Sequence, residues 1–326
     1  MSVAHGRPRA INFEDVNVAP LCAADFEDCL AGDAESFIHY ADICFILGDI
    51  TESCSRNSLT KAKKEYYQSQ IFRWPRVLPT HLRISHLSAN NADEYSLCGY
   101  DLNTRQLHIP YFISLAILGR PSTRNTISAQ GILAASFVAG IFQELLVRDD
   151  IGHLAPIFTR YCVASSFFLV SLRSIPELWD ACQPDLEVLR LCLKELSKRW
   201  KSAIGGSKAL ESILNTQRHN ATPMNKRLLP LTREQHFFFD GFPLELCHMW
   251  TPCTTFYQGA AANAGHFTQY AQDHSLIDAA QGRGIEPIVS TAPFTSVDEQ
   301  EIEVLPLADF LVDGLDNWLS EEASAV

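Results

Sequence analysis

Residues 107–122 read LHIPYFISLAILGRPS, and this stretch indicates the fold class. Its apolar residues surround a single serine, Ser114, so a helix here would be apolar on nearly every face and therefore buried. The letters GRPS at 119–122 would end that helix, because glycine and proline often follow helix C-termini and a serine can cap the next helix. The sequence therefore predicts a core helix with other elements packed around it.

Helical patterns continue on both sides of this stretch. Short turns marked by proline and glycine separate them, and no repeat of fixed period is present. We expect further helices over 33–50, from Ser58 to Pro75, over 122–147, from His153 or Pro156 to Leu172, from Pro184 to Trp200, and over 203–214. The fold class predicted is all-α, an irregular antiparallel helical bundle or solenoid.

Three of these expectations are specific enough to be checked residue by residue. The 33–50 helix would end near Gly48 and bury a broad face formed by Phe37, Ile38, Ala41, Cys44, Phe45 and Leu47. The second helix would close at Pro75, because proline disfavours helix in the residue before it, which makes 74–79 a short rigid connection. Residues 215–264 lose the helical pattern but are rich in aromatic residues, so we expect an irregular segment packed on the bundle.

Composition and charge indicate a folded body followed by an acidic tail. Of the 326 residues, 47% are apolar, and the net charge is −12. The 43 residues after Arg283 hold ten acids and no lysine or arginine, so the body is nearly neutral. A neutral body argues against a large phosphate-binding face and against direct contact with nucleic acid. We expect an extended N-terminal arm over 1–24, a helical domain over 25–283 and an acidic tail over 284–326.

The compartment and the relation to membranes also follow from the sequence. The ten cysteines are scattered, and several lie in apolar helical runs, which predicts free thiols in a reducing compartment. The first residues lack the apolar centre of a signal peptide. The longest uninterrupted apolar run, 131–142, is shorter than the roughly 20 residues that span a membrane. We therefore expect a soluble intracellular protein that does not contact a membrane.

The usual catalytic and metal-binding motifs are not found in the sequence. It contains no GxSxG, GxxxxGK[ST], GxGxxG or HExxH pattern. The histidine pairs 81/86 and 266/274 lack the i, i+4 spacing that places two rings at one metal ion. Cys247 and His248 could form a couple, yet adjacent side chains point apart, which favours a core histidine. We expect no catalytic residues, no metal and no cofactor.

Several motifs in chain order resemble a known family. The residues that carry the resemblance are Gly6-Arg7-Pro8, Trp74, Leu78-Pro79, Leu107-His108, Tyr111, Leu118 and Arg120-Pro121. They resemble the regulatory domain, or middle homology region, of the fungal binuclear-zinc-cluster transcription factors, over roughly residues 6–215. The zinc cluster of that family is missing here, because the chain has no CxxC pair. The resemblance implies a nuclear regulator that begins partway through the domain and lacks its own DNA-binding module.

The acidic tail is the candidate output element. Residues 301–319 read EIEVLPLADFLVDGLDNWL, in which acids are interspersed with Leu, Phe and Trp. This composition is typical of activation segments that fold as a helix in an apolar groove of a coactivator. A C-terminal helix docked on the protein's own core is an equally good interpretation. The candidate activation residues are Asp309, Phe310, Leu311, Asp313, Leu315, Asp316, Trp318 and Leu319.

The sequence thus favours a transcription regulator that acts through partners. Those partners would be a coactivator, a DNA-binding family member in a homodimer or heterodimer, and a small-molecule effector. The resemblance implies the nucleus; without it, the cytoplasm is expected. Two alternatives stay open, an all-α enzyme with an unrecognised site and a helical scaffold or adaptor. A buried acid or histidine with a strongly shifted pKa inside a closed cavity would favour the enzyme.

Overall fold

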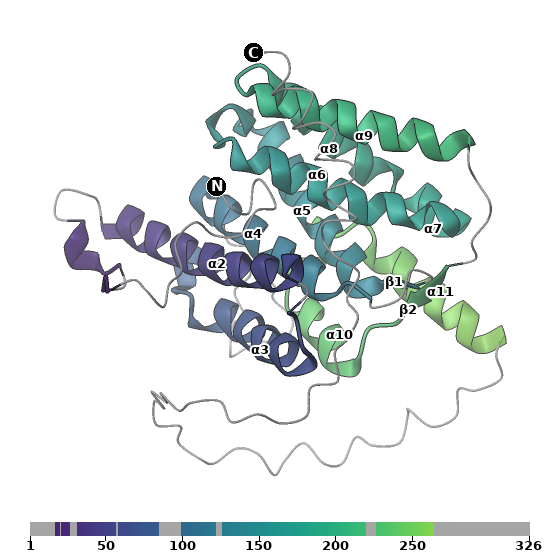
Figure 1. Ribbon diagram of the computed structural model, residues 1–326, viewed down its shortest axis with the longest axis horizontal. Coiled ribbons are helices and arrows are strands. Elements are labelled where there is room, and N and C mark those ends of the chain that lie inside the picture. Colours follow the sequence, from purple (N-terminus) through teal and green to yellow (C-terminus); the bar gives the residue numbers. More distant parts are fainter. Residues whose placement is uncertain are drawn as a thin grey trace, which may run out of the picture.

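The computed structural model describes residues 17–19, 21–26, 31–56, 58–84, 99–121, 126–219 and 226–263. Within these ranges the protein is all-α, as predicted, with one sheet of two short strands (Figure 1). The α-helices are α2 (Ala31–Ser55), α3 (Lys61–Val77), α4 (Leu102–Leu118), α5 (Ala129–Val147), α6 (Ile157–Val170), α7 (Pro176–Ala181), α8 (Gln183–Ser197), α9 (Lys201–His219), α10 (Arg233–Asp240) and α11 (Trp250–Asn263). The 3-10 helices are η2 (Ala23–Asp25), η3 (Thr80–Leu82), η4 (Ile151–His153), η5 (Ser171–Ser174) and η6 (Leu244–Leu246), and the strands are β1 (Thr126–Ser128) and β2 (Arg227–Leu229).

Helix α4 is the core helix that the sequence predicted. Every residue from 107 to 118 is buried. The helix begins five residues earlier than expected, because the Asp101 carboxylate accepts a hydrogen bond from the Thr104 N–H at 2.7 Å and caps the first turn. It continues through Pro110, although a proline inside a helix removes one backbone hydrogen bond and costs about 3 kcal/mol. Burial of both turns around Pro110 offsets that cost.

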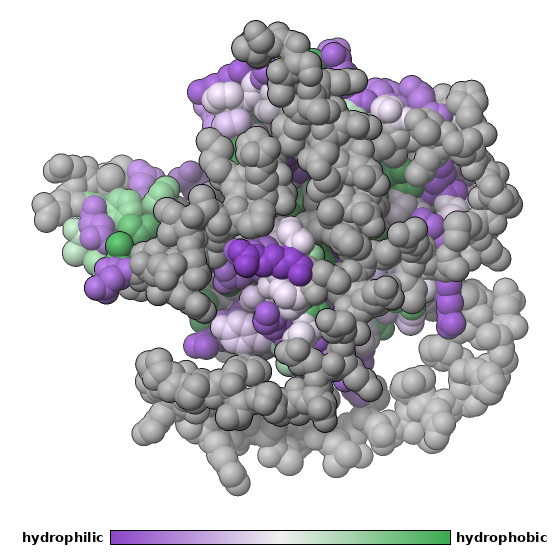
Figure 2. Space-filling view, viewed as in Figure 1, coloured by the Kyte–Doolittle hydropathy of each residue, from purple (hydrophilic) through white to green (hydrophobic). Residues whose placement is uncertain are grey.

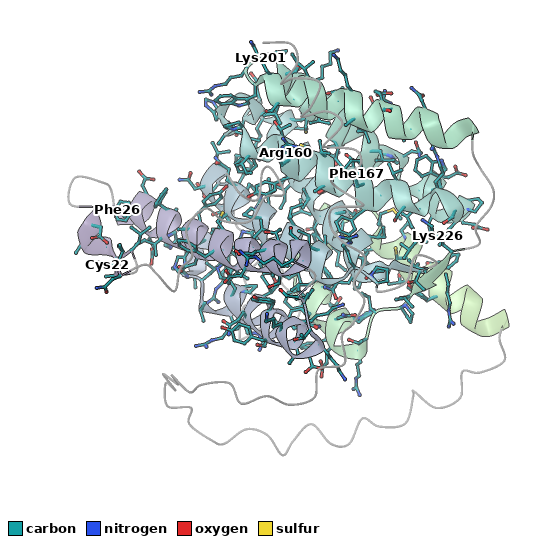
Figure 3. The ribbon with its side chains drawn as sticks, in the orientation of Figure 1. Cys22, Phe26, Arg160, Phe167, Lys201 and Lys226 are labelled. Atoms are coloured by element: carbon teal, nitrogen blue, oxygen red, sulfur yellow. The ribbon has the colours of Figure 1, made fainter. Side chains whose placement is uncertain are left out.

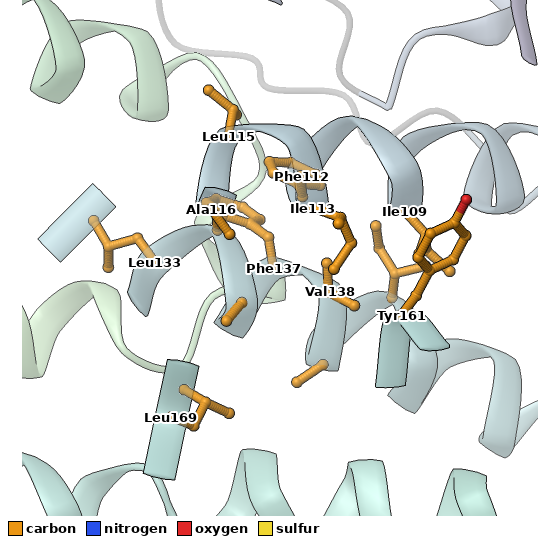
Figure 4. Packing of buried hydrophobic residues seen from close by; sticks show 14 of the residues in the cluster. Ile109, Phe112, Ile113, Leu115, Ala116, Leu133, Phe137, Val138, Tyr161 and Leu169 are labelled. Atoms are coloured by element: carbon orange, nitrogen blue, oxygen red, sulfur yellow. The ribbon is translucent and has the colours of Figure 1, made fainter. Parts of the chain in front are cut away.

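Helix α5 packs against α4 and completes the centre of the molecule. The Phe112 and Phe137 rings stack with centroids 4.7 Å apart, and Figure 4 shows them among Ile113, Ala116 and Val138. Among the described residues, α5 is the one helix long and apolar enough to cross a membrane. This helix, 129–147, is longer than the uninterrupted apolar run 131–142 on which the sequence prediction was based. Most of α5 is buried inside the protein, and buried core helices share that length and composition.

The remaining helices surround this pair. Helix α2 packs mainly on α4, α6 packs on α5, and α8 and α9 pack on each other and on α6. In Figure 1, α9 and α8 form the upper edge, α2 and α3 lie at the lower left, and α10 and α11 lie at the lower right. The sequence predicts Leu186, Leu189, Leu193, Leu196 and Trp200 on the inner side of the helix from Pro184. The four leucines are buried, whereas α8 ends at Ser197 and Trp200, beyond its end, is only partly buried against the core. The structure is therefore an irregular bundle around α4 and α5.

Helix α2 differs from its prediction in length and in its buried face. It runs through Gly48 to Ser55. Besides Ala34, its buried apolar residues are Ile43, Leu47, Ile50 and Cys54, which follow an i, i+4, i+7, i+11 spacing. Phe37 and Phe45, which we expected inside, are about half exposed. The sequence is apolar on several faces of this helix, so only its contact with α4 decides which face is buried. Apolar residues gather over η2 and the start of α2, at the left of Figure 2.

Helix α3 does not close at Pro75, as the sequence predicted. It begins after the N-cap Thr60 and ends at Val77, with Pro75 in its last turn. A proline there removes a single backbone hydrogen bond, and burial of Trp74 and Leu78 on either side keeps the turn in place. The rigid connection is consequently shorter than expected, and η3 follows it directly.

The two strands and the segment from 226 to 263 also depart from the sequence prediction. Residues 126–128 are a strand, and the following helix begins at Ala129 after the N-cap Ser128. The strand pairs in parallel with Arg227–Leu229, in a register that joins Ile127 to Leu228. Residues expected to be irregular form β2, α10, η6 and α11. They do pack on the bundle, because Phe239 and Met249 are completely buried.

Candidate regulatory site

Three residues of the family-like motifs lie together in the core, although α3 and α4 carry them more than thirty residues apart. The Trp74 and Tyr111 rings stack with centroids 5.0 Å apart, and the His108 ring meets Trp74 edge-on at 5.6 Å. Leu78 and Leu107 are buried beside them. Aromatic pairs of this kind contribute about 0.5–1.5 kcal/mol beyond burial. The motif residues therefore form the contact between α3 and α4, which we call the motif cluster.

The polar atoms of the motif cluster are incompletely paired. The Trp74 indole N–H and the Tyr111 hydroxyl are buried and make no hydrogen bond within the described part of the chain. His108 Nδ1 lies 2.9 Å from the Thr104 carbonyl oxygen, and because a carbonyl only accepts, Nδ1 carries the proton. Burial lowers the pKa of His108 to about 4, so the ring is neutral near pH 7 and its Nε2 is an acceptor.

Helix α10 and the turn after it cover the motif cluster. The Phe238 ring lies 4.4 Å from Phe72 and 6.4 Å from Tyr111, measured between centroids. The Phe242 ring lies 6.0 Å from Tyr111 and 5.2 Å from Phe112. The aromatic segment anticipated from the sequence is thus a lid of side chains over α3 and α4. It excludes water from the two unpaired donors.

A chain of hydrogen bonds joins the start of α10 to α4. The Gln235 amide completes a capping box with Thr232 and donates to Gln130 Oε1 at 2.5 Å. Gln130 in turn donates to the Leu115 carbonyl oxygen at 2.8 Å. Each hydrogen bond of this type makes a net contribution of about 0.5–1.5 kcal/mol to the stability of the fold. The lid is therefore attached to the core by specific contacts as well as by apolar burial.

A second attachment is a buried polar cluster where α5, α8 and the turn before α11 meet. The Asp185 carboxylate, which is completely buried, accepts a hydrogen bond from Ser136 Oγ at 2.6 Å. Its other oxygen lies 2.6 Å from His248 Nδ1. The Met249 N–H donates to Ser136 Oγ at 3.1 Å. The hydrogen bond that His248 donates to the Asp185 carboxylate raises the pKa of His248, and partial burial opposes that effect. We call this cluster the Asp185 clamp.

The clamp contains serine, histidine and aspartate, but it is not arranged as a nucleophilic triad. Catalysis would need a hydrogen bond between the serine and the histidine, and here both bind the aspartate instead. Cys247 and His248 do not form the couple considered from the sequence. The Cys247 thiol lies 3.7 Å from the Leu133 carbonyl oxygen, and burial raises its pKa above the ordinary value. Among the described residues, no group of His, Cys, Asp and Glu could hold a metal ion.

The candidate activation residues between 309 and 319 lie outside the described residues, as do most of the predicted N-terminal arm and the whole acidic tail. The structure therefore does not relate them to the motif cluster or to the Asp185 clamp, and the division into arm, body and tail stays a prediction. The clamp itself was missed by sequence reasoning. Asp185 is 49 residues from Ser136 and 63 from His248, and no spacing in the sequence relates positions so far apart.

Comparison with curated proteins finds similar regulatory proteins in fungi. The acetamidase regulatory protein of Aspergillus fumigatus is 27% identical over 252 residues, which is 72% of this chain and 31% of that protein. Those of Aspergillus oryzae and Emericella nidulans are each 30% identical over 62% of this chain, covering 27% and 26% of their own lengths. This similarity supports a fungal regulatory protein.

This chain spans less than a third of the length of the curated relatives it matches. No family model matches the sequence. No solved structure matches it either.

Proposed function

We propose that this chain is the regulatory part of a fungal transcription regulator of the binuclear-zinc-cluster type. The observation that carries the proposal is the motif cluster, because Trp74, His108 and Tyr111 bear the family resemblance and meet in one buried contact. Similarity to the acetamidase regulatory proteins supports the same conclusion. In this proposal the protein works in the nucleus, and DNA is bound by a partner of the same family rather than by the residues of this chain.

The acidic segment after Arg283 is the proposed output element. Leu311, Leu315, Trp318 and Leu319 would lie on one face of a helix that begins at Ala308, with Asp309, Asp313 and Asp316 elsewhere. Such a helix binds an apolar groove of a coactivator, and its acids keep the apolar residues hydrated before binding. Gly314 lowers the intrinsic helicity by about 1 kcal/mol, which favours folding on contact.

A small-molecule effector is also part of the proposal, and the motif cluster is where we place its polar contacts. The Trp74 N–H and the Tyr111 hydroxyl are buried donors with no partner among the residues that the structure describes, and each such group costs about 1–3 kcal/mol. A small acceptor molecule bound under α10 would satisfy them. Burial keeps His108 neutral near pH 7, so it cannot act as a general acid there, and its edge-on contacts with the Trp74 and Tyr111 rings favour a structural role in this proposal.

A reporter assay tests the output element. Residues 1–326 and residues 1–283 are each fused to an unrelated DNA-binding domain, and transcription is measured. We expect activation by the longer chain and none by the shorter one. The variant Leu315→Ala/Trp318→Ala should lose activation as well, whereas the matched control Ser320→Ala/Ser324→Ala, outside the amphipathic stretch, should retain it. Equal activity of all four fusions would contradict the proposal and favour a scaffold or an enzyme.

A further inference from the structure

Helix α10 lies at the lower edge of the bundle in Figure 1 and exposes the Phe237 ring. Phe239, on the inner side of this helix, is completely buried, whereas 75% of Phe237 is exposed. A ring exposed to that extent gives up the apolar burial that Phe239 obtains. Aromatic residues are enriched where one protein surface contacts another, so Phe237 is a candidate anchor for such a contact.

Four exposed side chains form one face of α10. Arg233, Phe237 and Asp240 have the i, i+4, i+7 spacing that places residues along one side of a helix, and His236 lies beside them. The His236 and Trp250 ring centroids are 4.9 Å apart, so the start of α11 borders this face. From Arg233 to Asp240 the face is about 10 Å long at 1.5 Å per residue. We call it the α10 face.

The charges at the two ends of the α10 face are opposite to those that a helix by itself favours. Cations are disfavoured at the N-terminus of a helix dipole and anions at its C-terminus. Arg233 is nevertheless the first residue of α10 and Asp240 the last, and neither forms an ion pair with a residue that the structure describes. Glu234 follows the preference of the dipole, but it lies on another side of the helix. The stability of α10 alone therefore does not explain where Arg233 and Asp240 are placed.

The α10 face is complementary to a second copy of itself. When two α10 helices lie antiparallel, a two-fold axis between His236 and Phe237 places Arg233 of each chain opposite Asp240 of the other. His236 and Phe237 of one chain then meet Phe237 and His236 of the other at the centre. Antiparallel packing also brings the positive end of each helix dipole beside the negative end of the other. Parallel packing would instead bring like charges together.

We propose that two copies of this chain associate through their α10 faces as a two-fold symmetric dimer. Arg233 and Asp240 form two ion pairs across the contact, and the two Phe237 rings are its apolar centre. Stable interfaces bury about 800 Å² on each partner, and a face about 10 Å long is smaller than that, so the dimer is transient. The contact forms between folded chains whether or not they regulate transcription.

Sedimentation velocity of the full chain tests the association. In about 0.15 M salt, which screens the repulsion between chains of net charge −12, the weight-average mass should rise with concentration from 36.4 kDa towards twice that value. Phe237→Ala should raise the dissociation constant about tenfold or more, because a central aromatic anchor is lost. A parent chain that stays monomeric up to about 1 mM would overturn the proposal, as would an unchanged dissociation constant in Phe237→Ala.

Two charge-reversal variants test the antiparallel arrangement. Arg233→Asp and Asp240→Arg should each dimerise about tenfold more weakly than the parent, because like charges then meet at both ends of the contact. Mixed in equal amounts, the two variants should associate with each other as strongly as the parent does, because every carboxylate of one faces a guanidinium of the other. With one variant labelled by a fluorophore, a mixture that does not form the mixed dimer would overturn the proposal.

The same variants distinguish loss of the contact from loss of the fold. Each substitution gives α10 a charge that its dipole favours, so thermal unfolding should occur at or above the temperature of the parent. The control Lys201→Asp makes the same change in charge at the first residue of α9, at the opposite edge of the molecule (Figure 3). It should dimerise like the parent, and an equal weakening in this control would refute a specific site on α10.

Sedimentation and the reporter assay separate failure of this inference from failure of the proposed function. A chain that activates transcription but stays monomeric would refute the dimer and leave the proposed function intact. A chain that forms the mixed dimer of Arg233→Asp and Asp240→Arg, while none of its fusions activates transcription, would refute the proposed function and establish the α10 contact.

Discussion

Replacing Gly140 with alanine should detach the lid from the core. Gly140 lies inside α5, and a Cβ atom there would be 2.0 Å from the Leu246 carbonyl oxygen and less than 3 Å from two further backbone atoms of Leu246. An ordinary contact needs at least 3.4 Å, so the η6 backbone would have to move by more than 1 Å. No side-chain rotation can relieve a contact with backbone.

The magnitude follows from what moves with η6. Leu246 and Met249 are buried, and a fully buried side chain of this kind contributes about 1.5–3 kcal/mol. Displacement would also pull the Met249 N–H away from Ser136 and loosen the Asp185 clamp. Alanine gains about 1 kcal/mol over glycine in a helix. We expect a net loss of about 3 kcal/mol in the free energy of unfolding, measured by urea denaturation of the full chain.

Gly206→Ala is the matched control. Gly206 is also buried inside a helix, α9, but a Cβ there meets methyl groups of Val163, Thr159 and Leu193, and the shortest contact is 2.9 Å. Small movements of those side chains can relieve it, so this variant should stay within about 1 kcal/mol of the parent protein. If both variants unfold at the same urea concentration, the reasoning about the close contact between α5 and η6 is wrong.

Two further predictions concern the titrating groups. Burial lowers the pKa of His108 in the folded protein to about 4 from about 6.5, so the neutral ring contributes its full stabilisation above pH 6.5 and loses it as the pH falls. We expect the free energy of unfolding, measured by urea denaturation, to fall by about 2 kcal/mol between pH 7 and pH 5. This loss of stability between pH 7 and pH 5 should be absent in His108→Gln. If the variant loses as much stability over this range as the parent protein, other groups cause the loss. For Asp185→Asn, the pKa of His248, which the Asp185 hydrogen bond raises, should fall towards 6.5 in an NMR titration, whereas exposed Asp180→Asn should leave it unchanged. The raised pKa of His248 stabilises the folded protein at pH values below the pKa of the unfolded state, and this stabilisation is lost as the pH rises through the pKa of the folded state. The difference in the free energy of unfolding between the parent and Asp185→Asn should therefore be larger at pH 6 than at pH 9. A difference independent of pH would contradict the assigned hydrogen bond.

The buried helices could be predicted from the sequence because their signal is local. The apolar run at 107–118 and the leucine spacing of α8 each bury the residues expected, since a helix repeats every 3.6 residues whatever surrounds it. The all-α class followed from the same patterns. The motifs at Trp74, His108 and Tyr111 were also visible in the sequence, although their contact was not.

Only the tertiary structure decided which faces are buried and which distant residues meet. Phe37 and Phe45 are as apolar as Ile43 and Leu47, and contact with α4 alone determines that the second pair is buried. Pro75 stays helical because packing on both sides outweighs a local preference of a few kcal/mol. The β1–β2 pairing and the Asp185 clamp join residues that are 49 to 101 positions apart, and their energy exists only after the chain has brought those residues together. Local periodicity therefore determined the helices of this protein, and long-range packing determined its candidate regulatory site.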